Sequence, residues 1–183
     1  MYEKYGQFID GKWHKSSTGE TYEVINPANE EIIGKASKAS PEDVDKALLS
    51  AQKGLEVWKK TPPWQRAYIL RRIADKMREK QDILAKWMTL EVGKPFAEAK
   101  GEVNGAADIY EWNAEETKRI YGQTVESRFE DTRVHVYYQP VGVVAALVPW
   151  NFPLVLSARK ISTALAAGCS VIVKPDVITP GVV

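Results

Sequence analysis

Two polar side chains stand where a parallel sheet would present them to a bound molecule. Asn151 lies between two prolines after the apolar stretch 141–148, and Lys174 ends the apolar stretch 170–174. An amide donates and accepts hydrogen bonds, a lysine carries a positive charge, and ligands gather beyond the carboxyl ends of parallel strands. The spacing also allows plainer roles, in which Asn151 caps the next helix and Lys174 is a solvated lysine at a strand end.

The elements that would position these residues form a predicted βαβ unit. Residues 141–148 are apolar almost throughout, which is typical of a strand covered on both faces, and residues 170–174 return to strand. Between them, residues 154–167 have a helical composition that ends at Gly168. Such a unit implies two parallel strands joined by a right-handed crossover. Because two parallel strands do not make a stable sheet, we expect further strands after Val183.

The chain before this unit is predicted to form short strands and then a helical layer, so the fold class is α/β. The pair Asp10-Gly11 predicts a hairpin, and residues 22–25 predict a strand that ends at an Asn-Pro turn. A helix is expected to begin at Pro41, because Ser40 can cap it and Asp43 completes a capping box.

Apolar residues at helical spacing predict four helices between residues 41 and 121. Core packing is the expected role of their apolar stripes. Residues 133–138 then alternate in polarity, which predicts a half-exposed strand. The stripes of the four helices include Val44, Leu48, Tyr68, Ile73, Ile83, Trp87, Met88, Val103, Ala107 and Tyr110.

The composition excludes several classes of protein. The 25 Lys and Arg residues against 24 Asp and Glu give a net charge of +1, mixed along the chain, which argues against nucleic-acid binding. With one cysteine, Cys169, and two histidines far apart, neither a disulfide framework nor a metal site is predicted. Residues 139–158 carry no charge but hold two prolines and an asparagine in their middle, so no membrane span is predicted. The first residues lack the apolar core of a signal peptide, and a cytoplasmic location is expected.

Neither a GxxxxGK[ST] loop nor a GxGxxG loop occurs, so a glycine fingerprint does not argue for nucleotide binding. A series of short motifs instead carries a resemblance along nearly the whole chain. Together they resemble the N-terminal portion of the NAD(P)-dependent aldehyde dehydrogenase superfamily, most of all its succinate semialdehyde and related semialdehyde dehydrogenases. The motifs are Phe8-Ile9-Asp10-Gly11-Lys12-Trp13, Val24-Ile25-Asn26-Pro27, Glu91-Val92-Gly93-Lys94-Pro95, Gln139-Pro140-Val141-Gly142-Val143-Val144, Pro149-Trp150-Asn151-Phe152-Pro153, Ala158-Arg159-Lys160, Ala164-Leu165-Ala166-Ala167-Gly168-Cys169 and Val171-Ile172-Val173-Lys174-Pro175.

The resemblance implies a reaction in which a cysteine thiolate attacks an aldehyde, hydride passes to NAD(P)+ and water releases the acid. It implies that the amide of Asn151 donates to the developing oxyanion, a charge that a preorganised neutral donor stabilises. Lys174 is implied to bind the adenosine ribose, and Pro149 and Trp150 are assigned to the cofactor site with it. Lys160 matches a lysine near the catalytic centre, although a surface role is equally open.

Two departures from the family pattern limit these implications. Most NAD-using members carry a glutamate where this chain has Val177. A glutamate there would repel the 2′-phosphate of NADP, so its absence opens the site to NADP, whereas the carboxylate of the neighbouring Asp176 disfavours NADP. The cofactor is therefore expected to be NAD or NADP. The family's nucleophilic cysteine, general-base glutamate and cofactor loop lie beyond Val183, so the chain alone is predicted to be inactive. Cys169 is not expected to replace that nucleophile, because free cysteines are usually buried and inert.

The resemblance also divides the chain. It implies N-terminal strands and a helical layer over 1–123, an oligomerisation-arm strand over 124–139 and the first, incomplete βαβ of a Rossmann-like domain over 140–183. The arm implies a homo-oligomer, and as an unpaired edge it predicts self-association of this chain. Two alternatives stay open: a non-catalytic, partner-binding protein of the same family, and a split enzyme completed by a second chain. The identity of the aldehyde, and whether the end at Val183 is natural, also stay open.

Overall fold

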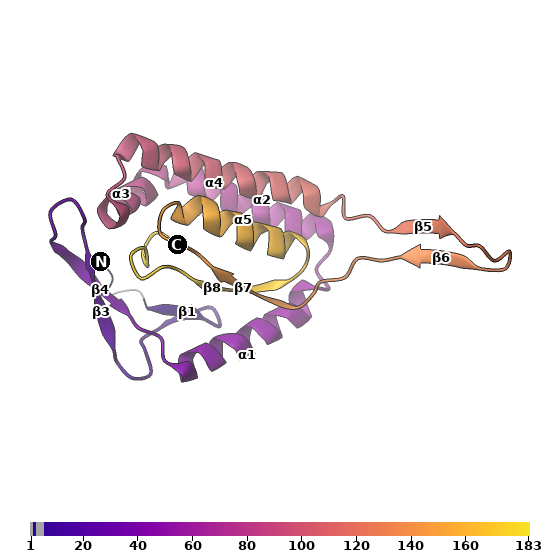
Figure 1. Ribbon diagram of the computed structural model, residues 1–183, viewed down its shortest axis with the longest axis horizontal. Coiled ribbons are helices and arrows are strands. Elements are labelled where there is room, and N and C mark those ends of the chain that lie inside the picture. The colour runs from indigo at the N-terminus through magenta and orange to yellow at the C-terminus, as the bar shows by residue number, and fades with distance from the viewer. Residues whose placement is uncertain (1, 3–5) are drawn as a thin grey trace.

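Helices lie on both sides of a short pair of parallel strands, and a long hairpin extends away from them (Figure 1). The computed structural model describes Tyr2 and residues 6–183. In chain order the elements are β1 (Gln7–Ile9), β2 (Lys12–His14), β3 (Thr21–Ile25), β4 (Ile32–Ser37), α1 (Pro41–Trp58), α2 (Pro63–Glu79), α3 (Gln81–Val92), α4 (Phe96–Thr117), β5 (Gln123–Glu126), β6 (Arg133–Val136), β7 (Val143–Leu147), α5 (Pro153–Ala166) and β8 (Ser170–Lys174).

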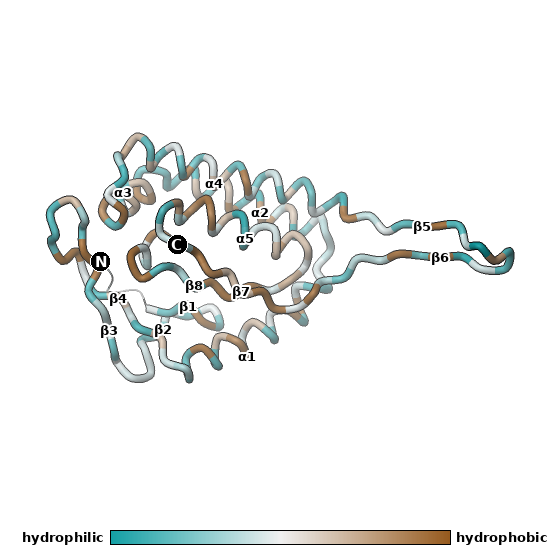
Figure 2. Tube along the Cα trace, in the orientation of Figure 1, coloured by the Kyte–Doolittle hydropathy of each residue, from teal (hydrophilic) through white to brown (hydrophobic). Residues whose placement is uncertain are grey.

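The predicted βαβ unit is confirmed. β7 and β8 pair in parallel, with Val143 opposite Ser170 and Leu147 opposite Lys174, and α5 forms the crossover. α5 packs on one side of this pair and α1 contacts the other side. Figure 2 shows the hydrophobic strands at the centre of the molecule, between these helices. The carboxyl ends of both strands consequently lie at one edge.

The capping box at the start of α1 is also confirmed. Ser40 Oγ accepts a hydrogen bond from the N–H of Asp43 at 3.2 Å, and a carboxylate oxygen of Asp43 accepts one from the N–H of Ser40 at 3.0 Å. The N–H of Ser17 donates to the same carboxylate at 3.1 Å. These bonds, chiefly the one from Ser40, hold the pKa of Asp43 well below its usual range. The cap therefore ties the helix to the preceding strands.

The helices α2, α3, α4 and α5 build the core. α4 lies against the other three, and four of its eight buried residues are alanines, which allow helix axes to approach closely. Leu70, Met88 and Val103 are fully buried among them. The alanines of these four helices with no exposed surface are Ala74, Ala85, Ala99, Ala106, Ala107, Ala114 and Ala158.

Several residues predicted to be core are exposed. Val44 and Leu48 of α1 are 47% and 39% exposed, and Tyr68 and Ile83 are 61% and 57% exposed. Similarly, β7 is not covered on both faces, since Leu147 is 64% exposed. Periodicity shows which side chains share a face, but a neighbouring element must cover that face to bury it, and the described part of the chain leaves these residues partly uncovered.

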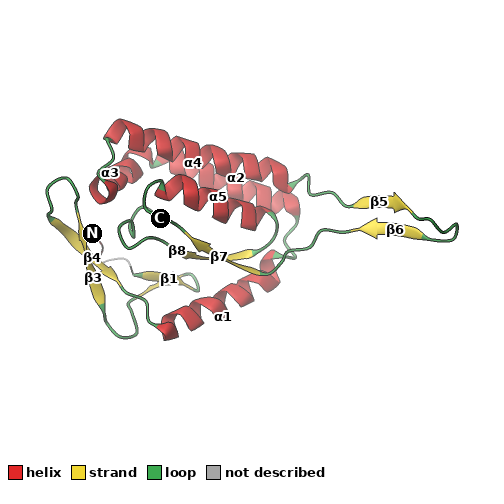
Figure 3. Ribbon diagram, viewed as in Figure 1, coloured by secondary structure: helices red, strands yellow, loops and turns green. Residues whose placement is uncertain are grey.

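The segment predicted to be an arm is a hairpin of two strands. β5 and β6 form an antiparallel pair (Figure 3), with Gln123 opposite Val136. All residues of both strands are exposed. The strand expected over 133–138 ends at Val136, so Tyr137 lies outside it. Every residue of β6 is exposed, because no other element covers either face of the hairpin in the described residues.

A buried carboxyl group, Glu91 of α3, holds the loop that follows β8. The N–H groups of Gly181 and Val182 donate to its two oxygens at 2.8 and 3.1 Å, and the hydroxyl of Tyr2 donates to it as well. Glu91 has no exposed surface. This burial raises the pKa of Glu91 to about 7, although the three hydrogen bonds act in the opposite direction.

The raised pKa of Glu91 predicts a pH-dependent stability. Because the folded-state pKa of about 7 exceeds the usual 4.5, the folded chain binds more protons between these values, and the free energy of unfolding should fall as pH rises through that window. The contribution is at most about 3 kcal/mol. Urea denaturation at pH 4.5 and pH 7.5 measures it.

The substitution Glu91→Gln should remove this part of the pH dependence while lowering stability at both pH values. Glu98→Gln, at an exposed position of α4, is the control for loss of one carboxyl group. An unchanged pH dependence in Glu91→Gln would show that another group titrates.

Candidate functional site

The candidate site lies at the carboxyl edge of the parallel strands. The N–H of Val148 donates to the carbonyl oxygen of Lys174 at 3.1 Å, which extends the pairing by one step beyond β7. The chain then turns through Pro149, Trp150 and Asn151 before α5 begins. The structure thus brings Lys174 and the Asn151 turn to the same edge, as the sequence predicted.

Asn151 does not cap α5. The N-cap residue is Phe152, which makes no side-chain cap hydrogen bond, and α5 starts at Pro153. The plainer interpretation of Asn151 as a helix cap is therefore wrong. Asn151 is exposed, and in the part of the chain that the structure describes its side-chain amide has no hydrogen-bond partner. The amide is available to a molecule bound at this edge.

Glu102 of α4 takes the place of the missing cap. Its Oε1 accepts hydrogen bonds from the N–H of Leu154 at 3.0 Å and of Val155 at 3.3 Å. Its other oxygen pairs with the ammonium group of Lys94. A carboxylate at a helix N-terminus is favourable, because it satisfies free N–H groups and interacts with the helix dipole.

This contact has a consequence for phosphate binding. In dinucleotide-binding βαβ units the pyrophosphate sits on the N–H groups at the start of the first helix. Here the N–H groups of Leu154 and Val155 already donate to Glu102. They are not free for a phosphate, which agrees with the absence of a GxGxxG loop.

Lys94 reaches the same turn from the end of α3. Gly93 ends that helix in the left-handed conformation, with φ of 77°, and the chain then directs Lys94 toward α5. The Lys94 ammonium donates to the carbonyl oxygen of Asn151 at 3.3 Å and lies 3.9 Å from the ring centroid of Phe152. A lysine can bind a carbonyl dipole and an aromatic face in this way at once.

Sequence reasoning missed the roles of Lys94 and Glu102. Lys94 belongs to a motif that carried the family resemblance without any assigned role. Glu102 follows Ala99 by three residues, so it falls on the buried face of α4, where it is 6% exposed. A carboxyl group within an apolar stripe was the available signal, because buried charges require partners.

The residues assigned to the cofactor are accessible. Lys174 is exposed at the end of β8, and Trp150 is 48% exposed. Val177 is 56% exposed in the loop that follows, whereas the carboxylate of Asp176 accepts the N–H of Ile178 at 3.0 Å within that loop. Pro149 is exposed beside Trp150. The exposed Lys174 ammonium and the indole of Trp150 are groups of the kind that contact a nucleotide.

Two other candidates lie apart from this edge. Lys160 is half-buried on α5, about 10 Å along the helix axis from its start, and is not brought to the Asn151 turn. Cys169 is 3% exposed and precedes β8, so it lies at the amino end of the strand, about 16 Å of extended chain from Lys174. This position supports the expectation that Cys169 is not the nucleophile.

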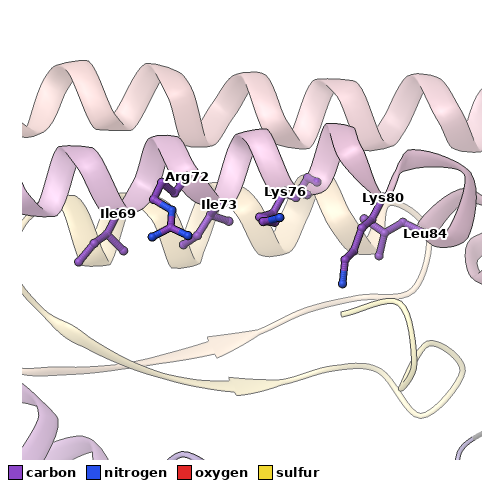
Figure 4. A pocket seen from close by; sticks show the side chains of 7 residues that line it. Ile69, Arg72, Ile73, Lys76, Lys80 and Leu84 are labelled. Carbon is purple, nitrogen blue, oxygen red and sulfur yellow. The ribbon is translucent and has the colours of Figure 1, made fainter.

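A pocket on the surface also lies away from this edge. A cavity of about 410 Å³ lies along α2 and the start of α3, where the apolar side chains alternate with cations (Figure 4). None of the candidate site residues lines it. Its walls include Ile69, Ile73 and Leu84 with Arg72, Lys76 and Lys80.

Two general features of the described residues bear on the site. No group of three or more His, Cys, Asp and Glu side chains there is arranged to hold a metal ion. None of the helices in this part of the chain combines the length and the apolar character that crossing a bilayer demands.

Comparison with known proteins gives close relatives. Glutarate-semialdehyde dehydrogenase of Pseudomonas aeruginosa is 47% identical over 173 residues, and succinate-semialdehyde dehydrogenase [NADP(+)] of Escherichia coli is 46% identical over 172 residues. Each alignment covers 94% of this chain. The chain spans about 36% of the length of these relatives and corresponds to their N-terminal part.

The fold of this chain is also similar to that of solved structures. A crystal structure of an E. coli NADP dependent enzyme matches with a TM-score of 0.92 and 46% identity, over 94% of this chain and 36% of that one. Betaine aldehyde dehydrogenase from Staphylococcus aureus in complex with NAD+ matches with a TM-score of 0.92 and 36% identity, over 96% of this chain and 35% of that one. The fold expected from the sequence, the N-terminal part of the aldehyde dehydrogenase fold, is confirmed.

The model of the aldehyde dehydrogenase family matches residues 13–183. That range contains both parallel strands, α5, and Lys94 and Glu102, which contact the Asn151 turn and the start of α5. The resemblance drawn from the short motifs is thereby confirmed, and the chain belongs to the aldehyde dehydrogenase family.

Proposed function

We propose that this chain forms the N-terminal part of a subunit that oxidises aldehydes to carboxylic acids with NAD or NADP. One observation carries the proposal: the side-chain amide of Asn151 has no partner among the described residues and stands at the edge where the parallel strands end. Lys174 lies at the same edge. A neutral donor and a cation are the two groups that an aldehyde oxygen and a nucleotide cofactor require there.

Asn151 has a simple role in the proposed reaction. When a thiolate attacks an aldehyde carbonyl, a negative charge develops on the carbonyl oxygen. The amide of Asn151 donates a hydrogen bond to that oxygen, and a donor fixed beforehand spends no reorganisation energy as the charge forms. The thiolate and the general base are supplied from outside residues 1–183, which follows from the family resemblance and from the burial of Cys169.

The cofactor accepts hydride when it is bound. We assign Lys174 to its adenosine ribose, with Trp150 and Pro149 beside it. The exposed side chain of Lys174 and its lack of an ion pair among the described residues support this assignment. NAD and NADP both stay possible, because Val177 brings no carboxylate while Asp176 does. One relative is named for NADP(+) and another was solved with NAD+.

The proposed substrate is a semialdehyde that ends in a carboxylate. Its support is that the two relatives described above carry the names glutarate-semialdehyde and succinate-semialdehyde dehydrogenase. Lys160 near the catalytic centre, the division at residues 123 and 139 and a cytoplasmic location stay predictions from the sequence.

Turnover tests the proposal. The chain alone should not reduce NAD+ or NADP+ with succinate or glutarate semialdehyde. A chimera in which this chain replaces the matching segment of the E. coli relative should do so, because the missing thiolate and base are then present. A folded chimera without turnover would contradict the proposal. Turnover by the chain alone that is lost in Cys169→Ala would assign the nucleophile to Cys169 instead.

Asn151→Ala in that chimera should lower kcat about 10²- to 10³-fold, the usual cost of one oxyanion donor. KM for the aldehyde should change little, because the hydrogen bond strengthens only as the charge develops. Asn104→Ala removes an exposed amide from α4 and serves as the matched control. Equal kcat values for the two variants would remove Asn151 from the mechanism.

The exposed hairpin predicts self-association. Val134 and Val136 of β6 are 42% and 36% exposed on a strand with an open edge, which favours pairing with a second chain. Light scattering should show a dimer or larger species, and the double change of Val134→Lys with Val136→Lys should shift it toward monomer. Val57→Lys, at a 70% exposed valine of α1, is the control. A wild-type chain that stays monomeric over a wide concentration range would contradict the prediction.

A further inference from the structure

We propose that Lys94 and Glu102 are positioning residues, which hold the Asn151 turn in the conformation that oxyanion stabilisation requires. The proposal rests on the role proposed for Asn151. Neither residue is expected to touch the substrate. Their function would be to fix the main chain on both sides of Asn151, so that its amide is aimed before the aldehyde arrives.

Glu102 fixes the main chain after the turn. Its Oε1 lies 3.0 Å from the N of Leu154 and 3.3 Å from the N of Val155, the second and third residues of α5. Since Phe152 supplies no side-chain cap, Glu102 is the side chain that holds these N–H groups. Its carboxylate belongs to α4, so the start of α5 is fixed to the centre of the helical core.

Lys94 fixes the turn itself. Its ammonium is paired with Glu102, donates to the carbonyl oxygen of Asn151 at 3.3 Å and lies 3.9 Å from the centroid of the Phe152 ring. The side chain of Lys94 is 11% exposed and that of Glu102 is 2% exposed. A single buried ion pair therefore contacts the carbonyl of residue 151, the ring of residue 152 and two N–H groups of α5.

The burial of this pair favours a positional role over a purely stabilising one. Removing two charges from water costs about as much as their attraction returns, so buried pairs contribute little net stability. Other pairs of α4, such as Arg78 with Asp108, lie at the surface and do not contact the turn. Lys94 and Glu102 instead form directional hydrogen bonds, each with a backbone group of the turn or of the first residues of α5.

Hydrogen exchange and NMR relaxation on this chain test the geometry without any enzymatic assay. In Glu102→Gln the amide hydrogens of Leu154 and Val155 should exchange about tenfold to a hundredfold faster, because a hydrogen bond to a charged group is lost. In Lys94→Met the NMR order parameter of the Asn151 side-chain amide should fall, and in Lys94→Arg it should fall less. Lys100→Met, which breaks an exposed pair with Asp82, is the matched control.

Kinetics in the chimera test whether the geometry matters for the reaction. Lys94→Met should lower kcat by about tenfold or more, as a small misplacement of a reacting group does, with KM for the aldehyde nearly unchanged. Lys94→Arg should recover part of the loss. In the Asn151→Ala variant, adding Lys94→Met should lower kcat only slightly further, because Lys94 acts through Asn151.

Two results would overturn the proposal. In the first, the amide hydrogens of Leu154 and Val155 exchange no faster in Glu102→Gln than in the control Lys100→Met, and the side chain of Asn151 is as ordered in Lys94→Met as in the unsubstituted chain. In the second, Lys94→Met lowers kcat by the same factor whether or not Asn151→Ala is also present. An inactive parent chimera would count against the proposed function, whereas the exchange and relaxation results would still decide the geometry.

Discussion

The close packing of α4 against its neighbouring helices holds the other elements in place. Its alanine-rich face lets α2, α3 and α5 approach, and α5 is the crossover that sets β7 and β8 side by side. The same helix carries Glu102 to the first turn of α5. One helix thus fixes the strand pair and the turn that leaves it, so the candidate site is rigid wherever it touches α4.

Two buried glutamates anchor the two loops at the carboxyl edge. Glu102 accepts the N–H groups at the start of α5, after β7, and Glu91 accepts those of Gly181 and Val182, after β8. Each carboxylate is held inside the helical layer and accepts hydrogen bonds from main-chain N–H groups. These bonds do not require particular side chains in the loop. The Asn151 amide and the Lys174 ammonium are left free between these anchors, as a ligand site requires.

The sheet itself is covered incompletely within these residues. Leu147 of β7 and the Val44 side of α1 are exposed although their patterns are those of core residues. This agrees with the length comparison, in which the chain spans about 36% of its relatives. The helical layer, by contrast, has a core of its own, with Leu70, Met88 and Val103 fully buried.

Features that depend on local spacing along the chain are predictable from its residues alone. Periodicity predicted the βαβ unit, Ser40 and Asp43 predicted the capping box, and the short motifs indicated the family and the strand-end position of Asn151. The packing of the helices sets the exposure of the α1 stripe, the capping of α5 by Glu102 instead of by Phe152, and the contacts of Lys94 and Glu102 with a turn more than 50 residues away. A helical or strand pattern is set by neighbours along the chain, whereas a buried ion pair is set by elements that meet only when the helices pack.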